Sequence, residues 1–197
     1  MGRNVVVITG CVGTGKTTVS EIVAKQIGAS HLDLSKIALE KSFLKGYDRE
    51  RDTPIADIRP LRKYVKLESE RVALVVLDGH YASHVAPVRR TLAVIVLRCH
   101  PSQLKRRLLK KGYGGRKVEE NLLSEMVDVC LCEALSRFDA DRVHEIDSTV
   151  RSPKQVAEDI ILLLEGKKRF KAGKIDWLSS LEREGRLQRV LEEKWSV

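Results

Sequence analysis

The stretch NVVVITGCVGTGKTTVS, from Asn4 to Ser20, determines how the rest of the chain is interpreted. It begins with an apolar β-branched run, Val5 to Ile8, and an amphipathic run begins at Thr18. The loop between them fits the pattern G-x-x-x-x-G-K-[ST] at Gly10, Gly15, Lys16 and Thr17. Strand, loop and helix follow one another in the order that a phosphate-binding loop requires. We therefore expect a nucleoside triphosphate site here rather than a simple glycine-rich turn.

Each residue type in this loop has a physical role. Glycines allow backbone torsions closed to other residues and bring N–H groups close to phosphate oxygens. The following helix adds its free N–H groups and its positive dipole end. Lys16 is placed to reach the β- and γ-phosphates, and the hydroxyl of Thr17 to bind Mg²⁺. The predicted cofactors are therefore ATP and Mg²⁺.

Composition predicts one domain with an appendage in a chain of 197 residues. The longest apolar runs, such as Ile160 to Leu164, are too short to cross a bilayer, so we expect a cytoplasmic protein with no membrane partner. Four cysteines without a C-x-x-C pair are expected to be reduced and mostly buried rather than zinc ligands.

The net charge of +9 is unevenly spread. Lys105 to Lys117 holds seven basic residues and no acidic one, and Lys167 to Lys174 holds five more. Such segments favour the phosphates of nucleotides or of RNA, although a solvated surface is the simpler alternative.

Strand and helix patterns alternate along the chain. Continuous apolar runs at Val72 to Leu77 and Leu92 to Leu97 are typical of central parallel strands covered on both faces. Shorter strands are expected at His31 to Leu34 and Arg142 to Ile146. Helices are expected over residues 15–27, 35–44 (capped by Ser35), 59–71, 102–110 (capped by Ser102), 117–138 and 153–165. The polar, turn-rich segment Gly46 to Pro54 is not expected to be helical. This alternation predicts an α/β three-layer sandwich with a mostly parallel sheet.

The last segment differs in character. A basic linker, residues 166–174, leads into an amphipathic stretch from Ile175 to Trp195 that Gly185 interrupts. We expect this tail to pack on the domain; the alternative is a partner-binding tail, because both tryptophans of the chain lie in it.

Two side chains follow the apolar run that ends at Leu77. Asp78 stands where a carboxylate can hold Mg²⁺ opposite Thr17, although a helix cap is the plain alternative. In an extended chain His80 would point to the same side as Asp78, where it could orient a water or accept a proton. A structural hydrogen bond is the alternative role for this histidine.

The basic segment Lys105 to Lys117 is interrupted by glycines from Gly112 to Gly115, which is typical of a mobile lid. Its cations could close over the transferring phosphoryl group; the candidates are Arg107, Lys111, Arg116 and Lys117. A basic surface turn is the alternative.

The chain resembles the atypical adenylate kinase family in five segments. These are GCVGTGKTT, GYDRERDTPIAD, VVLDGHY, VLRCHPSQLKRRLLKKGY and ENLLSEM. The similarity covers roughly Val5 to Glu165 and implies a P-loop nucleoside monophosphate kinase-like fold. It implies ATP binding by the phosphate-loop residues Gly13, Thr14, Gly15, Lys16, Thr17 and Thr18, and Lys111 of the basic segment is added to them as a cation of the lid. It also implies catalytic roles for Lys16, Asp78 and His80, and Mg²⁺ binding by Thr17 and Asp78. Arg107 of the basic segment is the fourth catalytic candidate, on the ground of its charge.

The same resemblance divides the chain. Residues 1–165 would form the kinase core, with a monophosphate-binding region at about 33–56 and a lid at about 110–120, and residues 166–197 the linker and tail. Family members act as nucleoside monophosphate kinases, AMP being the expected acceptor, and as ATPases in small ribosomal subunit maturation. The implied partners are a small-subunit ribosomal protein and rRNA.

Two positions depart from the family pattern. Leu39 stands where eukaryotic relatives have an arginine that can grip the acceptor phosphate, and Lys111 where their lid has an arginine. Leucine cannot bind phosphate, so that role would move to one of the nearby cations Lys36, Lys41, Arg49, Arg51 or Arg59. Lysine keeps the charge but loses planar bidentate contact.

Three functions remain open from the sequence. The first is an adenylate kinase that also hydrolyses ATP. The second is an assembly factor in which ATP switches the grip on a ribosomal protein or rRNA. The third is a small-metabolite kinase, such as a shikimate or dephospho-coenzyme A kinase. The Asp78-Gly79-His80 segment favours the first two.

Overall fold

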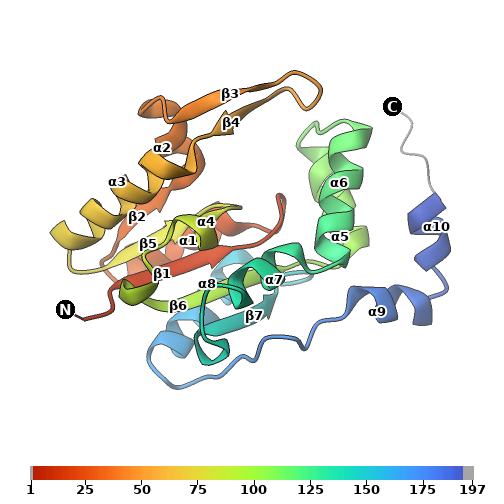
Figure 1. The fold of residues 1–197 in the computed structure, drawn as a ribbon. Helices are drawn as coiled ribbons and strands as arrows, with labels where there is room; N and C mark the ends of the chain where they lie inside the picture. Colours follow the sequence, from red (N-terminus) through yellow and green to blue (C-terminus); the bar gives the residue numbers. More distant parts are fainter. Residues whose placement is uncertain (1, 193–197) are drawn as a thin grey trace.

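The computed structural model describes residues 2–192 and has a five-stranded parallel sheet as its centre (Figure 1). The strands lie in the order β2 (Ser30–Asp33), β5 (Val75–Asp78), β1 (Val5–Thr9), β6 (Thr91–Arg98) and β7 (Val143–Asp147). Every neighbouring pair in this sheet is parallel. The apolar strand β1 is central and completely buried, so the loop that follows it leaves the middle of the sheet at its carboxyl edge.

Helices cover both faces of the sheet. The α-helices are α1 (Lys16–Gln26), α2 (Leu34–Glu40), α3 (Ile58–Arg71), α4 (Ala82–Val85), α5 (Pro101–Lys110), α6 (Gly115–Met126), α7 (Val129–Leu135), α8 (Pro153–Leu164), α9 (Trp177–Arg183) and α10 (Leu187–Glu192). Short 3₁₀ turns are η1 (Val88–Arg90) and η2 (Ala140–Arg142). Alternate residues of β1 face two separate cores, one against α1 and α8 and the other against α2 to α7. The predicted three-layer α/β sandwich with a parallel sheet is confirmed.

A two-stranded antiparallel hairpin stands beside the main sheet (Figure 1). It pairs β3 (Leu44–Asp48) with β4 (Thr53–Ala56). The sequence correctly indicated that residues 46–54 are not helical, but it did not predict strands there. The hairpin is hard to recognise because its strands are largely exposed, so they lack the alternating apolar pattern of a half-buried strand.

Two helices predicted from the sequence have wrong bounds. The helix expected over residues 35–44 ends at Glu40, and Leu44 already begins β3. The expected single helix over residues 117–138 breaks between α6 and α7, where Asp128 adopts a left-handed φ of 58°. The Asp128 carboxylate binds the guanidinium of Arg98, whose Nη2 also donates to the Glu125 carbonyl at 2.9 Å. This contact with β6 stabilises a break that helical periodicity does not reveal.

Two predicted helix caps are also wrong. Asp33, not Ser35, caps α2, since its carboxylate accepts the backbone N–H groups of Ser35 and Lys36. His100, not Ser102, caps α5 by accepting the Ser102 N–H. By contrast Ser152 caps α8 in a reciprocal pair with Gln155. Both wrong assignments have the same cause. In each case a polar side chain two residues before the predicted cap accepts the free N–H groups of the first helical turn.

The tail packs on the domain through α9. Trp177 and Leu181 are buried, and the Trp177 indole N–H donates to Glu125 Oε1 at 2.9 Å. Gly185, with a φ of 64°, separates α9 from α10 as the sequence indicated. The second tryptophan of the expected tail, Trp195, lies outside the described residues. Among residues 2–192 no helix has the length and apolar character needed to cross a membrane.

Candidate nucleotide site

The loop between β1 and α1 has a backbone that only glycine tolerates at several points. Gly10, Gly13 and Gly15 have φ values of 139°, 92° and 99°. A Cβ at Gly10 would lie 2.3 Å from the Leu97 carbonyl oxygen, and a Cβ at Gly13 would meet Leu104 and Leu108 at 3.0 Å. Gly15 is the N-cap of α1 and has open space on its Cβ side. The glycines thus seat the loop against β6 and α5 and leave its outer side free for phosphates.

The clash at Gly10 gives a direct test of this seating. Because Gly10 combines a left-handed φ with backbone contact to β6, Gly10→Ala is expected to lower the free energy of unfolding by about 1–3 kcal/mol. Gly28→Ala has a left-handed φ but no atom within 4 Å of its Cβ, so it serves as the matched control. Urea titration of both variants measures the difference. Equal losses in the two variants would argue against contact with Leu97 as the cause.

Lys16 lies inside the loop. Its Nζ donates to the Cys11 carbonyl at 2.9 Å, and the Thr14 hydroxyl donates to the same oxygen at 2.9 Å. The residue is only 9% exposed, and burial lowers the pKa of its ammonium group from the ordinary value. The loop therefore surrounds a cation that is largely removed from water. A positive charge in such a place attracts phosphate oxygens more strongly than one in solvent.

Thr17 and Asp78 come together as predicted from the sequence. The Thr17 hydroxyl donates to Asp78 Oδ1 at 3.4 Å, and Asp78 is 1% exposed at the carboxyl end of β5. Hydroxyl and carboxylate oxygens are the ligand types that Mg²⁺ prefers, so these residues fit that ion. Sequence reasoning missed His31, whose Nε2 lies 3.0 Å from Asp78 Oδ2. The sequence did contain a signal for this contact, because His31 lies in a predicted strand. That strand, β2, is hydrogen-bonded to β5, which carries Asp78.

His80 lies beside two cysteines. Its Nδ1 is 3.6 Å from Cys130 Sγ, and Cys130 Sγ is 3.9 Å from Cys11 Sγ. The Thr9 hydroxyl donates to the His80 carbonyl at 3.1 Å, which fixes the backbone after β5. Contact with Cys130 is the chief cause that raises the pKa of His80. Lys16, which carries the loop cation, is close enough to oppose that rise.

Arg107 of α5 contacts the segment that follows β7. Its Nη2 donates to the carbonyls of Ser148 and Thr149 at 2.7 and 3.0 Å. The Ser148 hydroxyl donates to the Thr14 carbonyl at 2.9 Å, so this arginine ties the segment after β7 to the phosphate loop. The structure therefore gives Arg107 a positioning contact; its predicted catalytic role stays a prediction.

A cavity of about 500 Å³ lies next to this contact. It is lined by the predicted residues Gly13, Thr14, Gly15, Thr18, Arg107 and Lys111, together with Ser148 and Arg151, which sequence reasoning missed. Ser148 and Arg151 follow the last strand, so a weak signal existed in the rule that ligands bind beyond the carboxyl ends of parallel strands. The cavity has the size of a nucleoside site and adjoins the phosphate loop.

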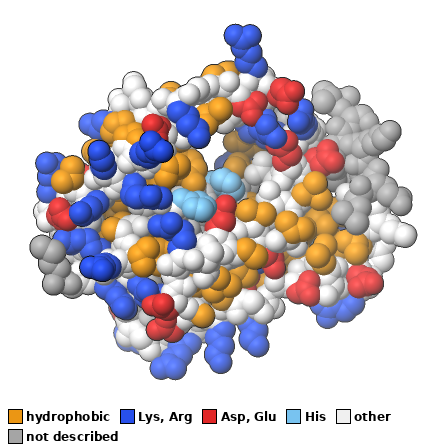
Figure 2. Space-filling view, viewed as in Figure 1, with side chains coloured by type: hydrophobic (Ala, Val, Ile, Leu, Met, Phe, Trp, Pro, Cys, Tyr) orange, Lys and Arg blue, Asp and Glu red, His pale blue; other side chains and the backbone are white. Residues whose placement is uncertain are grey.

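The lid and the hairpin contact each other above the sheet. Arg51 in the hairpin turn binds Glu120 of α6 through two hydrogen bonds of 2.9 and 2.8 Å. Lys117 Nζ donates to the Thr53 hydroxyl at 2.9 Å, and Arg116 pairs with Glu50 at 3.1 Å. In the space-filling view the molecule is hollowed below the hairpin, and histidine side chains lie at the edge of the hollow (Figure 2). The predicted monophosphate-binding region, through its hairpin, and the predicted lid are therefore in direct contact.

Leu39 is 57% exposed and offers no polar atom to a phosphate, as the sequence indicated. Of the alternative cations, Arg51 is bound to Asp48 and Glu120, and Lys41 lies over the Tyr64 ring. Within residues 2–192, Lys36, Arg49 and Arg59 are exposed and make no ion pair. These three remain candidates for the contact with an acceptor phosphate.

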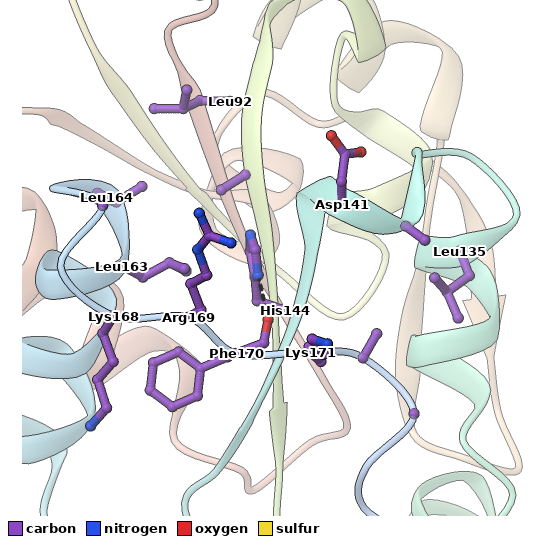
Figure 3. Close-up of a pocket in the computed structure, with 15 residues that line it drawn as sticks. Leu92, Leu135, Asp141, His144, Leu163, Leu164, Lys168, Arg169, Phe170 and Lys171 are labelled. Carbon is purple, nitrogen blue, oxygen red and sulfur yellow. Dashed lines mark hydrogen bonds between the residues drawn. The ribbon is translucent and has the colours of Figure 1, made fainter.

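A larger cavity, of about 890 Å³, lies at the opposite edge of the sheet (Figure 3). Its walls include Leu92 at the start of β6 and His144 near the start of β7. His144 Nδ1 donates to the Phe170 carbonyl at 2.7 Å, and Arg169 lies beside the imidazole ring (Figure 3). This contact ties the basic linker to the edge strand, so the cavity belongs to the linker and not to the nucleotide site.

Fold and site together define a P-loop protein of the α/β class. A family model described as an AAA domain matches residues 6–128. A protein of Methanocaldococcus jannaschii named "Putative adenylate kinase" is 34% identical over 172 residues, which cover 87% of this chain and 92% of that protein. A Pyrococcus furiosus protein of the same name is 36% identical over 180 residues, which cover 90% and 93%. The chain therefore belongs to the atypical adenylate kinase family of archaeal type.

Solved structures agree on the fold. Shikimate kinase from Acinetobacter baumannii, in complex with shikimate, matches with a TM-score of 0.60 at 18% identity and covers 84% of this chain and 95% of its own. Deoxyadenosine kinase from M. mycoides with bound dATP matches with a TM-score of 0.53 at 15% identity and covers 82% and 99%. At these identities the likeness concerns the fold alone.

Proposed function

We propose that this protein transfers the γ-phosphoryl group of Mg·ATP to a nucleoside monophosphate, AMP first, and more slowly to water. The observation that carries the proposal is that the hairpin contacts the lid, while Lys111 at the start of the lid lines the same cavity as Gly13 to Gly15 of the phosphate loop. Two segments that meet over one phosphate site suit a reaction between two phosphorylated substrates, in which water must be excluded.

Each residue has a role in this proposal. Lys16 and the exposed lid cations Lys111 and Arg116 stabilise charge on the transferring phosphoryl group. Thr17 and Asp78 would hold Mg²⁺, which would neutralise charge on the β- and γ-phosphates. The cavity beside Arg107 receives the nucleoside of ATP. Lys36, Arg49 and Arg59 are the proposed contacts for the acceptor phosphate.

The test is a coupled assay of ADP formation with ATP and each nucleoside monophosphate in turn. AMP is expected to give the fastest turnover. If no monophosphate accepts the phosphoryl group while ATP is still hydrolysed, the kinase half of the proposal is wrong. Fast transfer to shikimate or to dephospho-coenzyme A, but not to AMP, would favour a small-metabolite kinase.

The His80→Ala variant is expected to lose ATP hydrolysis while it keeps most of its phosphoryl transfer to AMP. A water needs orientation by a side chain, whereas AMP is oriented by its own binding site, so this variant is expected to lose about 10²-fold in ATP hydrolysis and much less in AMP phosphorylation. His84→Ala is the matched control, because that histidine pairs with Glu133 outside the loop. Steady-state rates with and without AMP give the comparison. An equal loss of both activities would instead assign His80 to the loop's structure.

A second role, in small ribosomal subunit maturation, follows from the family resemblance. We propose that ATP binding switches the grip on a ribosomal protein or rRNA. The supporting observation is exposed positive charge: all five cations of residues 167–174 are exposed, and Lys and Arg side chains gather over α3 on the face seen in Figure 2. Pull-down from lysate with wild type and Lys16→Ala tests it. Recovery of no ribosomal component with either protein would count against this role.

A further inference from the structure

Two thiols meet beneath the phosphate loop without an assigned role. Cys11 is the first loop residue after Gly10, and Cys130 lies in α7, 119 residues further along the chain. Their sulfur atoms are 3.9 Å apart, and the two residues are 1% and 4% exposed. A disulfide needs an S–S distance of about 2.05 Å, so a closure of about 2 Å would join them. Both cysteines are free in the structure.

The environment of the pair favours a reactive sulfur. The thiolate is the form of cysteine that attacks an oxidant. The hydrogen bond from Cys11 is the main cause that lowers the pKa of Cys130, to about 5, and His80 and Lys16 lower it further. The same hydrogen bond, with burial, raises the pKa of Cys11. The two sulfurs therefore share one hydrogen bond, and His80 and Lys16 favour the thiolate form of Cys130.

Cys99 shows that burial alone does not create this state. Its thiol is equally buried, but it donates to the His100 carbonyl at 3.7 Å and has no second cysteine beside it among the described contacts. Burial raises the pKa of Cys99 to about 12, so it stays a protonated, unreactive thiol at neutral pH. The contrast assigns the reactivity to the neighbours of Cys130.

We propose that Cys11 and Cys130 form an oxidation site, at which a hydroperoxide converts the thiol pair to a disulfide and thereby disables the phosphate loop. The Cys130 thiolate attacks one oxygen of hydrogen peroxide, the O–O bond breaks, and a sulfenic acid forms as hydroxide leaves. The Cys11 sulfur then attacks the Cys130 sulfur, and water leaves with the proton of Cys11. The two sulfurs lose two electrons in all, and the peroxide gains them.

The disulfide would disturb the loop at its most constrained point. The Cys11 carbonyl accepts hydrogen bonds from both Lys16 Nζ and Thr14 Oγ1, so moving Cys11 toward α7 displaces the loop cation. Oxidation also removes the sulfur partner of His80. Misplacement of reacting groups by about 1 Å can cost on the order of 10²-fold in rate. This functional consequence rests on the proposed nucleotide site, whereas formation of the disulfide does not.

The test uses the full-length chain with Cys132→Ser, because Cys130 and Cys132 otherwise lie in one tryptic peptide. The protein is treated with hydrogen peroxide, remaining free thiols are alkylated, and tryptic peptides are analysed by mass spectrometry without reduction. A linked pair of peptides, residues 4–16 joined to residues 118–137, is expected, and dithiothreitol should separate it. Cys130 recovered as sulfinic acid with Cys11 alkylated would overturn the pairing.

A second measurement follows the consequence. Binding of a fluorescent ATP analogue and phosphoryl transfer are compared before oxidation, after oxidation and after dithiothreitol, with a fall of at least about tenfold expected on oxidation. The fall should be reversible, and Cys130→Ser in the same background should not show it. A linked peptide with unchanged nucleotide binding would overturn the disabling step. Absence of transfer even in the reduced protein would refute the proposed kinase function, while the peptide result would still decide whether the pair oxidises.

Discussion

Replacing Lys16 with methionine is expected to lower phosphoryl transfer by on the order of 10²–10³-fold without lowering the stability of the fold. The loss of rate follows because this is the cation held inside the phosphate loop, at 2.9 Å from the Cys11 carbonyl. The effect on stability follows from burial, which lowers the pKa of the Lys16 ammonium group. Because the unfolded chain binds that proton more tightly than the folded one, the charge opposes folding at neutral pH.

Methionine removes the buried charge at similar length and leaves the Cys11 carbonyl with its hydrogen bond from Thr14. Thermal unfolding should therefore show a melting temperature equal to or above that of wild type. Lys25→Met is the matched control, since Lys25 is exposed in the last turn of the same helix. Lys16→Met with near-normal transfer, or with a clearly lower melting temperature, would contradict this account of the loop.

Much of the fold was predictable because local and tertiary preferences agree there. The apolar runs at β5 and β6 are buried on both faces, and the helix after the phosphate loop follows directly from the loop's glycines. The break at Asp128 was not predictable, because it depends on Arg98 from a strand 30 residues earlier. Local periodicity contains no information about that partner.

Some residues of the candidate site were likewise predictable from the sequence, and others were not. Residues from Gly13 to Thr18 are contiguous, so one pattern locates them, and Asp78 follows from its place at a strand end. His31, Ser148 and Cys130 reach the site from a neighbouring strand, a distant loop and a helix. These three residues belong to no sequence motif and have no characteristic spacing, so only the three-dimensional structure shows that they lie at the site.

The largest stability effect is expected at Arg98, which is 1% exposed at the end of β6. Its guanidinium binds Glu125 at 2.7 Å and also binds Glu145 and Asp128. The tail joins this network, since Trp177 donates to Glu125 and the backbone N–H of Lys174 to Glu145. Arg98→Ala leaves two buried carboxylates without their cation, so we expect a loss of about 3–5 kcal/mol in the free energy of unfolding.

Urea titration of Arg98→Ala measures this loss, and Arg116→Ala is the matched control. Arg116 also pairs with two carboxylates, Glu50 and Glu120, but it is largely exposed, so its removal should cost about 0–1 kcal/mol. Similar losses in the two variants would contradict the assignment of a buried ionic network.

The loss at Arg98 should also depend on pH. Burial raises the pKa of Glu125 above its usual range, and the charge of Arg98 opposes that rise. In Arg98→Ala the opposition is gone, so the pKa of Glu125 rises further above its value in the unfolded chain. A carboxyl group with a raised pKa binds its proton more tightly when folded, and its contribution to stability falls as the pH increases through that interval. The variant should therefore lose less stability relative to wild type at about pH 5 than at about pH 8, because protonation neutralises the carboxylate that Arg98 no longer compensates.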